Sequence, residues 1–259
     1  MKWVFQTLWD GLKRHILWRK LAVTDIQQVY RRSLLGMAWI AFSFALFVGV
    51  KILIFGAIAP VDPGEFAIWL TVGFWIWMYI QASVIDGCIT FINARPWIIG
   101  TNTPLSVYVY QTSTRVLINT LFSLPIVMAV LLFYKWPLTV NALWVIPGFL
   151  ALIANGLWVQ ILFGSICAQY RDVYHFVGSM MRVMFFLTPI LFMPEQLGDK
   201  AYLLNYNPFT HYLAIIREPI FSHQLPILSW QVVGSITLLG WILALMAFRK
   251  IGPYVAFRV

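Results

Sequence analysis

The residues best suited to chemistry lie in the stretch Gln169–Met193, QYRDVYHFVGSMMRVMFFLTPILFM. It begins with the adjacent charges Arg171 and Asp172 and continues as an apolar segment that carries one cation, Arg182, and one proline, Pro189. The adjacent charges would either form a local ion pair at a helix end or contact a cytosolic partner. A cation in such a segment is expected to be buried, and it either extends to the interface or lines an aqueous path. The pattern is typical of a path through a membrane rather than of a simple anchor.

The groupings that define common catalytic and metal sites are missing from the sequence. It has no Gly-Lys-Ser/Thr, so it cannot hydrolyse ATP by the P-loop route. No Ser/His/Asp set or carboxylate pair stands out, and the histidines lack zinc-ligand spacing. Asp86 is the one carboxylate available within a span, which gives a proton-coupled carrier little support. We therefore predict no catalytic residue and no metal site, and we expect Cys88 and Cys167 to be small packing residues.

The composition is that of an integral membrane protein. Of the 259 residues, 61% are hydrophobic and 10% charged, whereas soluble domains are about half apolar and about a quarter charged. Spans of about 20 residues use nearly the whole length and leave no room for a soluble catalytic domain. The net charge of +9 does not indicate nucleic-acid binding, because seven of the 18 Lys and Arg precede Leu34, where they orient a chain on an anionic membrane.

Helices must position these charged residues. Hydropathy predicts an all-α integral membrane protein with six transmembrane helices. Residues 1–33 are expected to form a cytoplasmic amphipathic interface helix and linker, and residues 34–259 the transmembrane domain. Pro125 is expected to kink the third span, and Gly148 and Gly156 to allow close packing of the fourth. The predicted spans are about 34–59, 66–92, 106–134, 142–168, 176–193 and 227–248.

The N-terminal segment has apolar residues at helical spacing, namely Phe5, Leu8, Trp9, Leu12 and Ile16. Charged residues fall between them, which suits a helix lying in the membrane interface. Such a helix would serve as a surface anchor, and it would also be able to dock a cytosolic partner.

Lys51 is a second cation within a predicted span, nearer the far end of the first one. We expect it either to be part of a functional site or to extend to the outer interface.

Two connecting segments are predicted to contain short helices. Asn93–Thr103, NARPWIIGTNT, reads as a cytoplasmic turn or a short helix along the membrane. Pro194–Pro226 is too long and too apolar for an ordinary loop. Within it Asn207 and Pro208 predict a helix start, and the helix is expected to stop at Pro219. About ten residues give about 15 Å, half a bilayer, so this helix would be re-entrant or interfacial.

The distribution of basic residues predicts the orientation. With both termini in the cytoplasm, that side receives 14 of the 18 Lys and Arg, and the outside receives four: Lys51, Lys135, Lys200 and Arg217. This bias favours six spans with cytoplasmic termini.

The aromatic content is high, with 13 Trp residues. Interfacial belts and packing account for most of them. The cluster Phe74–Tyr79 lies near the middle of the second span, so some of its rings would face protein or a lumen. A sugar path would use such rings, because the C–H faces of a pyranose stack on electronegative aromatic faces.

Four motifs in order and spacing carry a family resemblance, and the resemblance covers the chain from about Thr24 to the C-terminal residues. They are TDIQQVYRRSLLGMAWI at the first span, PLSVY from Pro104 at the third, YRDVYHFVGSMMRVMFFLTPILFMPEQL at the fifth and NPFTHYLAIIREPI before the sixth. With these motifs the chain resembles the transmembrane permeases of type-2 ABC exporters, in the branch that exports O-antigen and related surface polysaccharides.

The resemblance implies two permease copies, two copies of a cytosolic P-loop ATPase on a separate chain that holds the ATP and Mg, and no cofactor on this chain. It also implies an interface helix at about residues 3–22, a cytoplasmic gate between spans two and three, and periplasmic gate helices between spans five and six. It implies a path formed largely by the first and fifth spans of both copies. The expected pathway residues are Trp39, Phe42, Trp75, Arg182, Phe185 and Phe186. The expected gate residues are Arg95, Pro96 and Trp97 inside and Asn207, Pro208, Phe209, His211 and Tyr212 outside. The expected ATPase contacts are Arg14, Arg19, Arg31, Arg171 and Asp172.

The sequence thus predicts a multi-pass permease subunit, not an enzyme, in the bacterial inner membrane. It would export a lipid-linked polysaccharide, in contact with membrane lipids and with no nucleic acid. Three alternatives stay open: a same-fold exporter of teichoic acid, capsule or a small amphiphile; an intramembrane glycan-modifying enzyme, which would need a His or carboxylate cluster; and a structural scaffold, which would need neither Arg182 nor a half-crossing helix.

Overall fold

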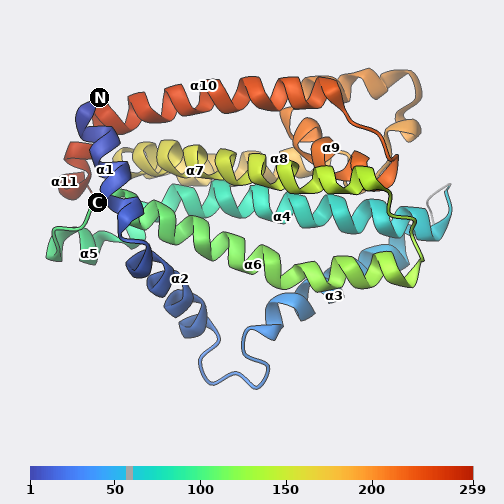
Figure 1. The fold of residues 1–259 in the computed structure, drawn as a ribbon, viewed down its shortest axis with the longest axis horizontal. Coiled ribbons are helices and arrows are strands. Elements are labelled where there is room, and N and C mark those ends of the chain that lie inside the picture. Colours follow the sequence, from blue (N-terminus) through green and yellow to red (C-terminus); the bar gives the residue numbers. More distant parts are fainter. Residues whose placement is uncertain (57–60, 259) are drawn as a thin grey trace.

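The computed structural model describes residues 1–56 and 61–258, and within them every regular element is a helix, which confirms the all-α prediction (Figure 1). The short segments are α1 (Lys2–Lys13), α2 (His15–Val29), α5 (Arg95–Gly100), α9 (Pro208–Phe221) and α11 (Val255–Arg258), with the 3₁₀ helices η1 (Val140–Trp144), η2 (Pro194–Tyr206) and η3 (Gly252–Tyr254). The longer helices are α3 (Ala38–Gly56), α4 (Pro63–Asn93), α6 (Ser106–Phe133), α7 (Val145–Gln169), α8 (Asp172–Leu187) and α10 (Ile227–Ile251).

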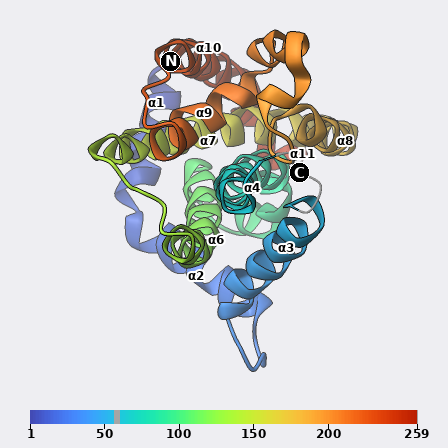
Figure 2. The same ribbon diagram turned by 90° about the vertical axis from the view of Figure 1, so that its right-hand side faces the viewer.

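The helix α4 forms the centre of the molecule, and α3, α6, α7, α8 and α9 pack around it (Figure 2). It begins at a strong N-cap: the Asp62 carboxylate accepts hydrogen bonds from the backbone N–H of Gly64 at 2.8 Å and of Glu65 at 3.3 Å. Pro63 follows at the first helical position, where its missing N–H costs nothing. In the most apolar stretch of α4, 78% of the residues are buried, against 17–33% in the corresponding stretches of α3, α6, α7 and α10. The aromatic cluster of α4 therefore faces protein.

The closest packing lies between α4 and α7, where small residues let the backbones approach, as predicted for the fourth span. A Cβ built on Gly164 would lie 3.0 Å from the carbonyl oxygen of Gly87 and 3.3 Å from the ring of Phe91. The two helices hold their spacing only without a side chain at this position.

The substitution Gly164→Leu is expected to lower the unfolding temperature in detergent, because overpacking of a buried contact costs about 1–3 kcal/mol. The matched control is Gly234→Leu in α10, since nothing lies within 4 Å of a Cβ built there. Both variants gain the same helix propensity, so the difference between them reports the packing. Equal unfolding temperatures for the two variants would contradict the close contact.

Within the described residues, five helices are long and apolar enough to cross a membrane: α3, α4, α6, α7 and α10. The third span continues as one helix through Pro125 in α6, and the predicted sixth span extends three residues further in α10. The first span starts at Ala38 instead of residue 34, because Arg32 and Gly36 have positive φ values of 64° and 53° that end any helix before it. Its predicted end lies at residues 57–60, outside the described residues.

The predicted fifth span is corrected most. Its helix, α8, begins at Asp172 and ends at Leu187, so its 16 residues give about 24 Å, short of the roughly 30 Å of a bilayer core. Pro189 ends the helix, because the residue before a proline is pushed out of the helical region: Thr188 has φ −95° and ψ 137°. The six-span topology therefore stays a prediction for this part of the chain.

Two shorter predictions are also corrected. The N-terminal interface helix is two helices, α1 and α2, which break at Arg14. The helix after Asn207 does not stop at Pro219 but continues through it to Phe221. Pro219 cannot donate to the carbonyl oxygen of Ile215, and that oxygen lies 2.9 Å from a Cβ built on Gly148, so it faces α7.

Candidate transport surface and its flanking segments

The exposed face of α3 carries the first two predicted pathway residues. Trp39 and Phe42 are three positions apart, so they share one side of the helix. Their ring centroids are 5.2 Å apart in an edge-to-face arrangement, and 39% and 50% of the two residues stay exposed. They line an open cavity of about 520 Å³ that also contains Phe47 and Lys51. The structure brings these aromatics together on a surface that this protomer leaves uncovered.

The end of α8 carries the other predicted aromatics, which point in different directions. The ring of Phe185 packs against Phe74 and Trp77 of α4, with centroids 6.1 and 5.7 Å apart. Phe186 is 69% exposed. Phe74 in turn stacks on Phe47 of α3 at 4.6 Å. A continuous run of rings therefore connects α8, through α4, to the exposed face of α3.

Arg182 is exposed in this protomer, which corrects the expectation that it is buried. Its guanidinium donates to the hydroxyl of Ser179 one turn earlier at 3.0 Å. It lies on α8 one turn before Phe185. The cation is thus free to contact whatever covers this surface.

Trp75 lies in a different place from the other predicted pathway residues. It is 5% exposed, it stacks on Phe149 of α7, and its indole N–H donates to the carbonyl of Thr120 in α6 at 2.9 Å. It supports the contact of α4 with α6 and α7 within the protomer.

The cytoplasmic gate residues Arg95, Pro96 and Trp97 form the start of the short helix α5, and all three are exposed. This confirms the short helix expected between residues 93 and 103. Trp97 borders a polar cavity of about 140 Å³, whose lining also includes Asp25 and Arg115. The predicted gate therefore touches a group of charges.

That group of charges was not predicted. The guanidinium of Arg115 in α6 lies 3.2 Å from the carboxylate of Asp86 in α4 and 3.6 Å from that of Asp25 in α2. Asp25 also accepts from Gln111 at 2.7 Å. In the sequence, Asp25, Asp86 and Arg115 stand as single charges near the inner ends of three predicted segments. Sequence alone does not say which of them face one another.

The predicted periplasmic gate residues hold the N-terminal part of α9. The side chain of Asn207 accepts from the N–H of Phe209 at 3.0 Å and donates to Leu187 and Thr188 at the end of α8. His211 lies within hydrogen-bond distance of Asn205 and Ser229, at 2.9 and 3.0 Å. Nine of the 14 residues of α9 are buried, so this helix is held by protein on most sides rather than lying free at an interface.

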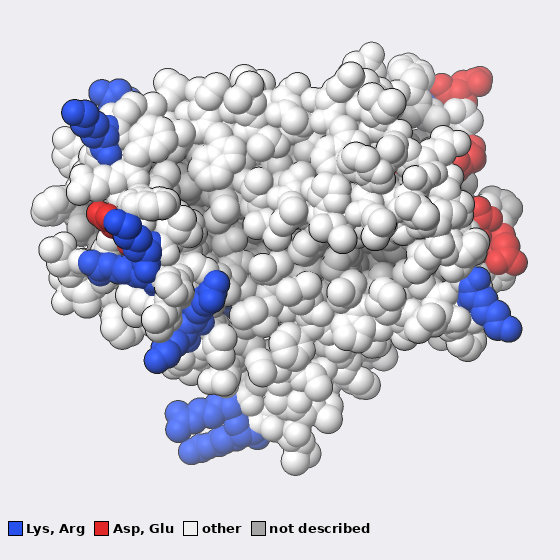
Figure 3. All heavy atoms as spheres, in the orientation of Figure 1, with Lys and Arg blue, Asp and Glu red and all other residues white. Residues whose placement is uncertain are grey.

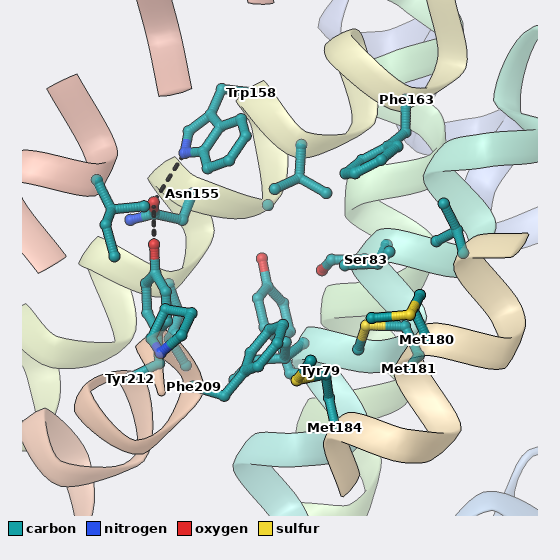
Figure 4. A pocket seen from close by; sticks show the side chains of 18 of the residues that line it. Tyr79, Ser83, Asn155, Trp158, Phe163, Met180, Met181, Met184, Phe209 and Tyr212 are labelled. Atoms are coloured by element: carbon teal, nitrogen blue, oxygen red, sulfur yellow. Dashed lines mark hydrogen bonds between the residues drawn. The ribbon is translucent and has the colours of Figure 1, made fainter. Parts of the chain in front are cut away.

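Tyr212 reaches from α9 into the centre of α7. Its hydroxyl donates to the side chain of Asn155 at 2.7 Å, and the indole N–H of Trp158 donates to the same oxygen at 2.7 Å (Figure 4). These groups border an apolar cavity of about 360 Å³ that Met180, Met181 and Met184 of α8 line from the other side (Figure 4). The helices α7, α8 and α9 therefore meet around one cavity.

Arg217 in α9 is a buried cation; the sequence analysis assigned it to the outer side of the membrane and did not predict its burial. It is 2% exposed, its guanidinium lies 3.2 Å from the ring centroid of Trp69, and it donates to the carbonyl of Pro189 at 2.6 Å. Trp69 also donates to the carbonyl of Phe192 at 3.1 Å. An arginine within an apolar helix is the signal that identifies such a site. The two residues hold the chain segment that follows α8.

The predicted ATPase contacts are exposed side chains: Arg14 at the break between α1 and α2, Arg19 in α2, Arg31 after it, and Arg171 and Asp172 at the start of α8. Arg171 and Asp172 do not form an ion pair with each other; the ion pairs of the described chain are those of Arg115. The local ion pair considered from the sequence is therefore not formed.

Cys88 and Cys167 are buried and free, and they pack in the core as small residues, as predicted.

Comparison with known proteins gives relatives over most of the chain. No protein-family model matches it. Two relatives from Klebsiella pneumoniae, each described as O-antigen export system permease protein RfbA, are 25% and 24% identical over 228 residues, which cover 86% of this chain and 85% of theirs. A protein of the same description from Myxococcus xanthus is 23% identical over 210 residues, 80% of each chain. These relatives confirm that the chain resembles the permeases of O-antigen export systems, as its four motifs predict.

Proposed function

We propose that this chain is the permease subunit of an ABC exporter that moves a lipid-linked polysaccharide of the O-antigen type across the bacterial inner membrane. The observation that carries the proposal is its similarity to O-antigen export permeases over 80–86% of its length. Five apolar helices support a multi-pass membrane protein. The absence of a P-loop sequence leaves ATP hydrolysis, with its Mg, to a separate subunit.

The path runs between two copies of this chain, along the exposed face of α3 and the exposed side of α8. Only 17% of the residues in the most apolar stretch of α3 are buried within the protomer, the lowest share among the five membrane-length helices. Trp39, Phe42 and Phe186 present rings on this surface. Stacking of sugar C–H faces on such rings is weak and tolerant of direction, which suits a polymer that must slide.

The ATPase subunits bind at the end of the molecule where both termini lie. On the face drawn in Figure 3, Lys and Arg side chains gather over that end, whereas most of the Asp and Glu side chains visible there lie at the opposite end. A basic end is the one that stays in the cytoplasm. Arg14, Arg19, Arg31, Arg171 and Asp172 are exposed and supply contacts to the ATPase, while α5 with Arg95 and Trp97 acts as the cytoplasmic gate and α9 as the periplasmic one.

Deletion of the gene tests the proposal. We expect lipid-linked polymer to accumulate inside the cell and the surface polymer to disappear, with wild-type protein restoring it. A matched strain that carries this chain but a P-loop lysine variant of the ATPase subunit is expected to show the same defect. Chemical analysis of the retained polymer distinguishes O-antigen from teichoic acid or capsule. Unchanged surface polymer in the deletion strain would contradict the export function.

A further inference from the structure

Lys51 is a cation inside the membrane-length helix α3, and it lies among aromatic rings from three helices. Its ammonium nitrogen lies 4.6 Å from the ring centroid of Phe47 and 5.8 Å from that of Phe55 in α3. It also lies 5.4 Å from the ring of Phe185 in α8 and 5.9 Å from that of Phe74 in α4. The amine therefore lies where α3, α4 and α8 meet.

The amine leans toward the start of α3, not toward its outer end. The nearest ring, Phe47, is one turn before Lys51, and the more distant ring, Phe55, is one turn after it. Long side chains on a helix lean in this direction. An amine that extended to the outer interface would lean the opposite way. Of the two alternatives considered from the sequence, extension to the outer interface is therefore not the one that this conformation adopts.

The amine has no carboxylate partner in the described part of the chain, where the ion pairs are those of Arg115. Contacts with ring faces offset only part of the cost of an ammonium in an apolar region. Lys51 also borders the open cavity of about 520 Å³ on the exposed face of α3. An anion that pairs with Lys51 would therefore come from outside this protomer, across the surface that the proposed path uses.

We propose that Lys51 binds the phosphate that joins the glycan to its lipid as the substrate passes between α3 and α8. The inference rests on the proposed function for the identity of the substrate. A phosphate is the anion that a lipid-linked glycan carries, and an ammonium binds it as a compact point charge. Arg182, exposed on α8 one turn before Phe185, supplies a second cation earlier along the same surface.

The test measures binding to the complex of this chain with its ATPase subunit in phosphatidylcholine nanodiscs. The probes are geranylgeranyl diphosphate and neutral geranylgeraniol, and native mass spectrometry gives the fraction bound. Lys51→Met is expected to weaken binding of the diphosphate about tenfold or more, because a hydrogen bond to a charged group is lost. Lys51→Arg keeps the charge and is expected to stay within about threefold of wild type. Lys200→Met, which removes an exposed cation from η2, is the matched control.

Equal affinity of wild type and Lys51→Met for the diphosphate would overturn the proposal. An equal loss of geranylgeraniol binding would overturn it too, because it would show a packing role rather than recognition of charge. Competition by phosphatidylglycerol as strong as by the diphosphate would assign the contact to an ordinary headgroup, against the proposal. This binding measurement does not involve export, so its failure is distinguishable from unchanged surface polymer in the deletion strain, which would remove the proposed function instead.

Discussion

The substitution Arg217→Ala is expected to unfold the end of the molecule formed by α9 and the segment that follows α8. It leaves the carbonyl of Pro189 without its donor, removes the cation from the ring of Trp69, and opens a cavity between α9 and α4. A lost hydrogen bond to a charged group and an unfilled cavity together cost about 3 kcal/mol. For a chain of this size we expect a fall in unfolding temperature of roughly 6–12 °C, measured in detergent by a thermal shift.

Two variants make this result specific. Arg182→Ala removes the same side chain from an exposed position, and it is expected to change the unfolding temperature by about 1–2 °C at most. Arg217→Lys keeps the charge but loses the planar guanidinium, so an intermediate fall is expected. An unfolding temperature of Arg217→Ala equal to that of Arg182→Ala would show that the buried contacts do not hold α9.

The helices could be predicted from the sequence because their signals are local. Length and hydropathy identified α4, α6, α7 and α10 to within a few residues, and Asn207 with Pro208 identified the start of α9. The small residues of the fourth span predicted close packing, which Gly156 confirms: a Cβ there would lie 2.6 Å from the hydroxyl of Tyr79. Each of these inferences needs only the residue and its neighbours in the chain.

The remaining features depend on contacts between distant segments. Pro189 was noted in the sequence, but the predicted fifth span extended past it to Met193 because the residues around it are apolar. In the structure the helix ends at Leu187. Arg182 and Arg217 have similar apolar neighbours in sequence, yet the first is exposed and the second is buried against Trp69, 148 positions earlier in the chain. Which cation is buried is decided by the aromatic and carbonyl groups that other segments bring to it. The pathway, gate and ATPase residues stay predictions, because their partners are other molecules.

The substitution Arg115→Met is expected to loosen the N-terminal helices at the end of the molecule where both termini lie (Figure 1). Arg115 links Asp25 in α2 to Asp86 in α4, so its loss leaves two carboxylates near each other without a cation. The three side chains are 24–31% exposed, so solvent screening reduces the cost to about 1–2 kcal/mol, below that of a fully buried pair. We expect faster hydrogen exchange in α2 and α5, measured on the purified protein, and weaker export, because Trp97 of the proposed gate borders the same cavity.

A double-mutant cycle separates the ion network from a general loss of stability. Asp86→Asn removes one of the two carboxylates, so its combination with Arg115→Met is expected to be less destabilised than the sum of the single variants, by about 1 kcal/mol. Lys250→Met, which removes an exposed cation from the last turn of α10 that forms no ion pair, is the control for charge at this end. If Arg115→Met leaves exchange in α2 at the wild-type rate, the network does not join the N-terminal helices to the gate. If the double variant is as unstable as the sum of the single ones, Arg115 and Asp86 act independently.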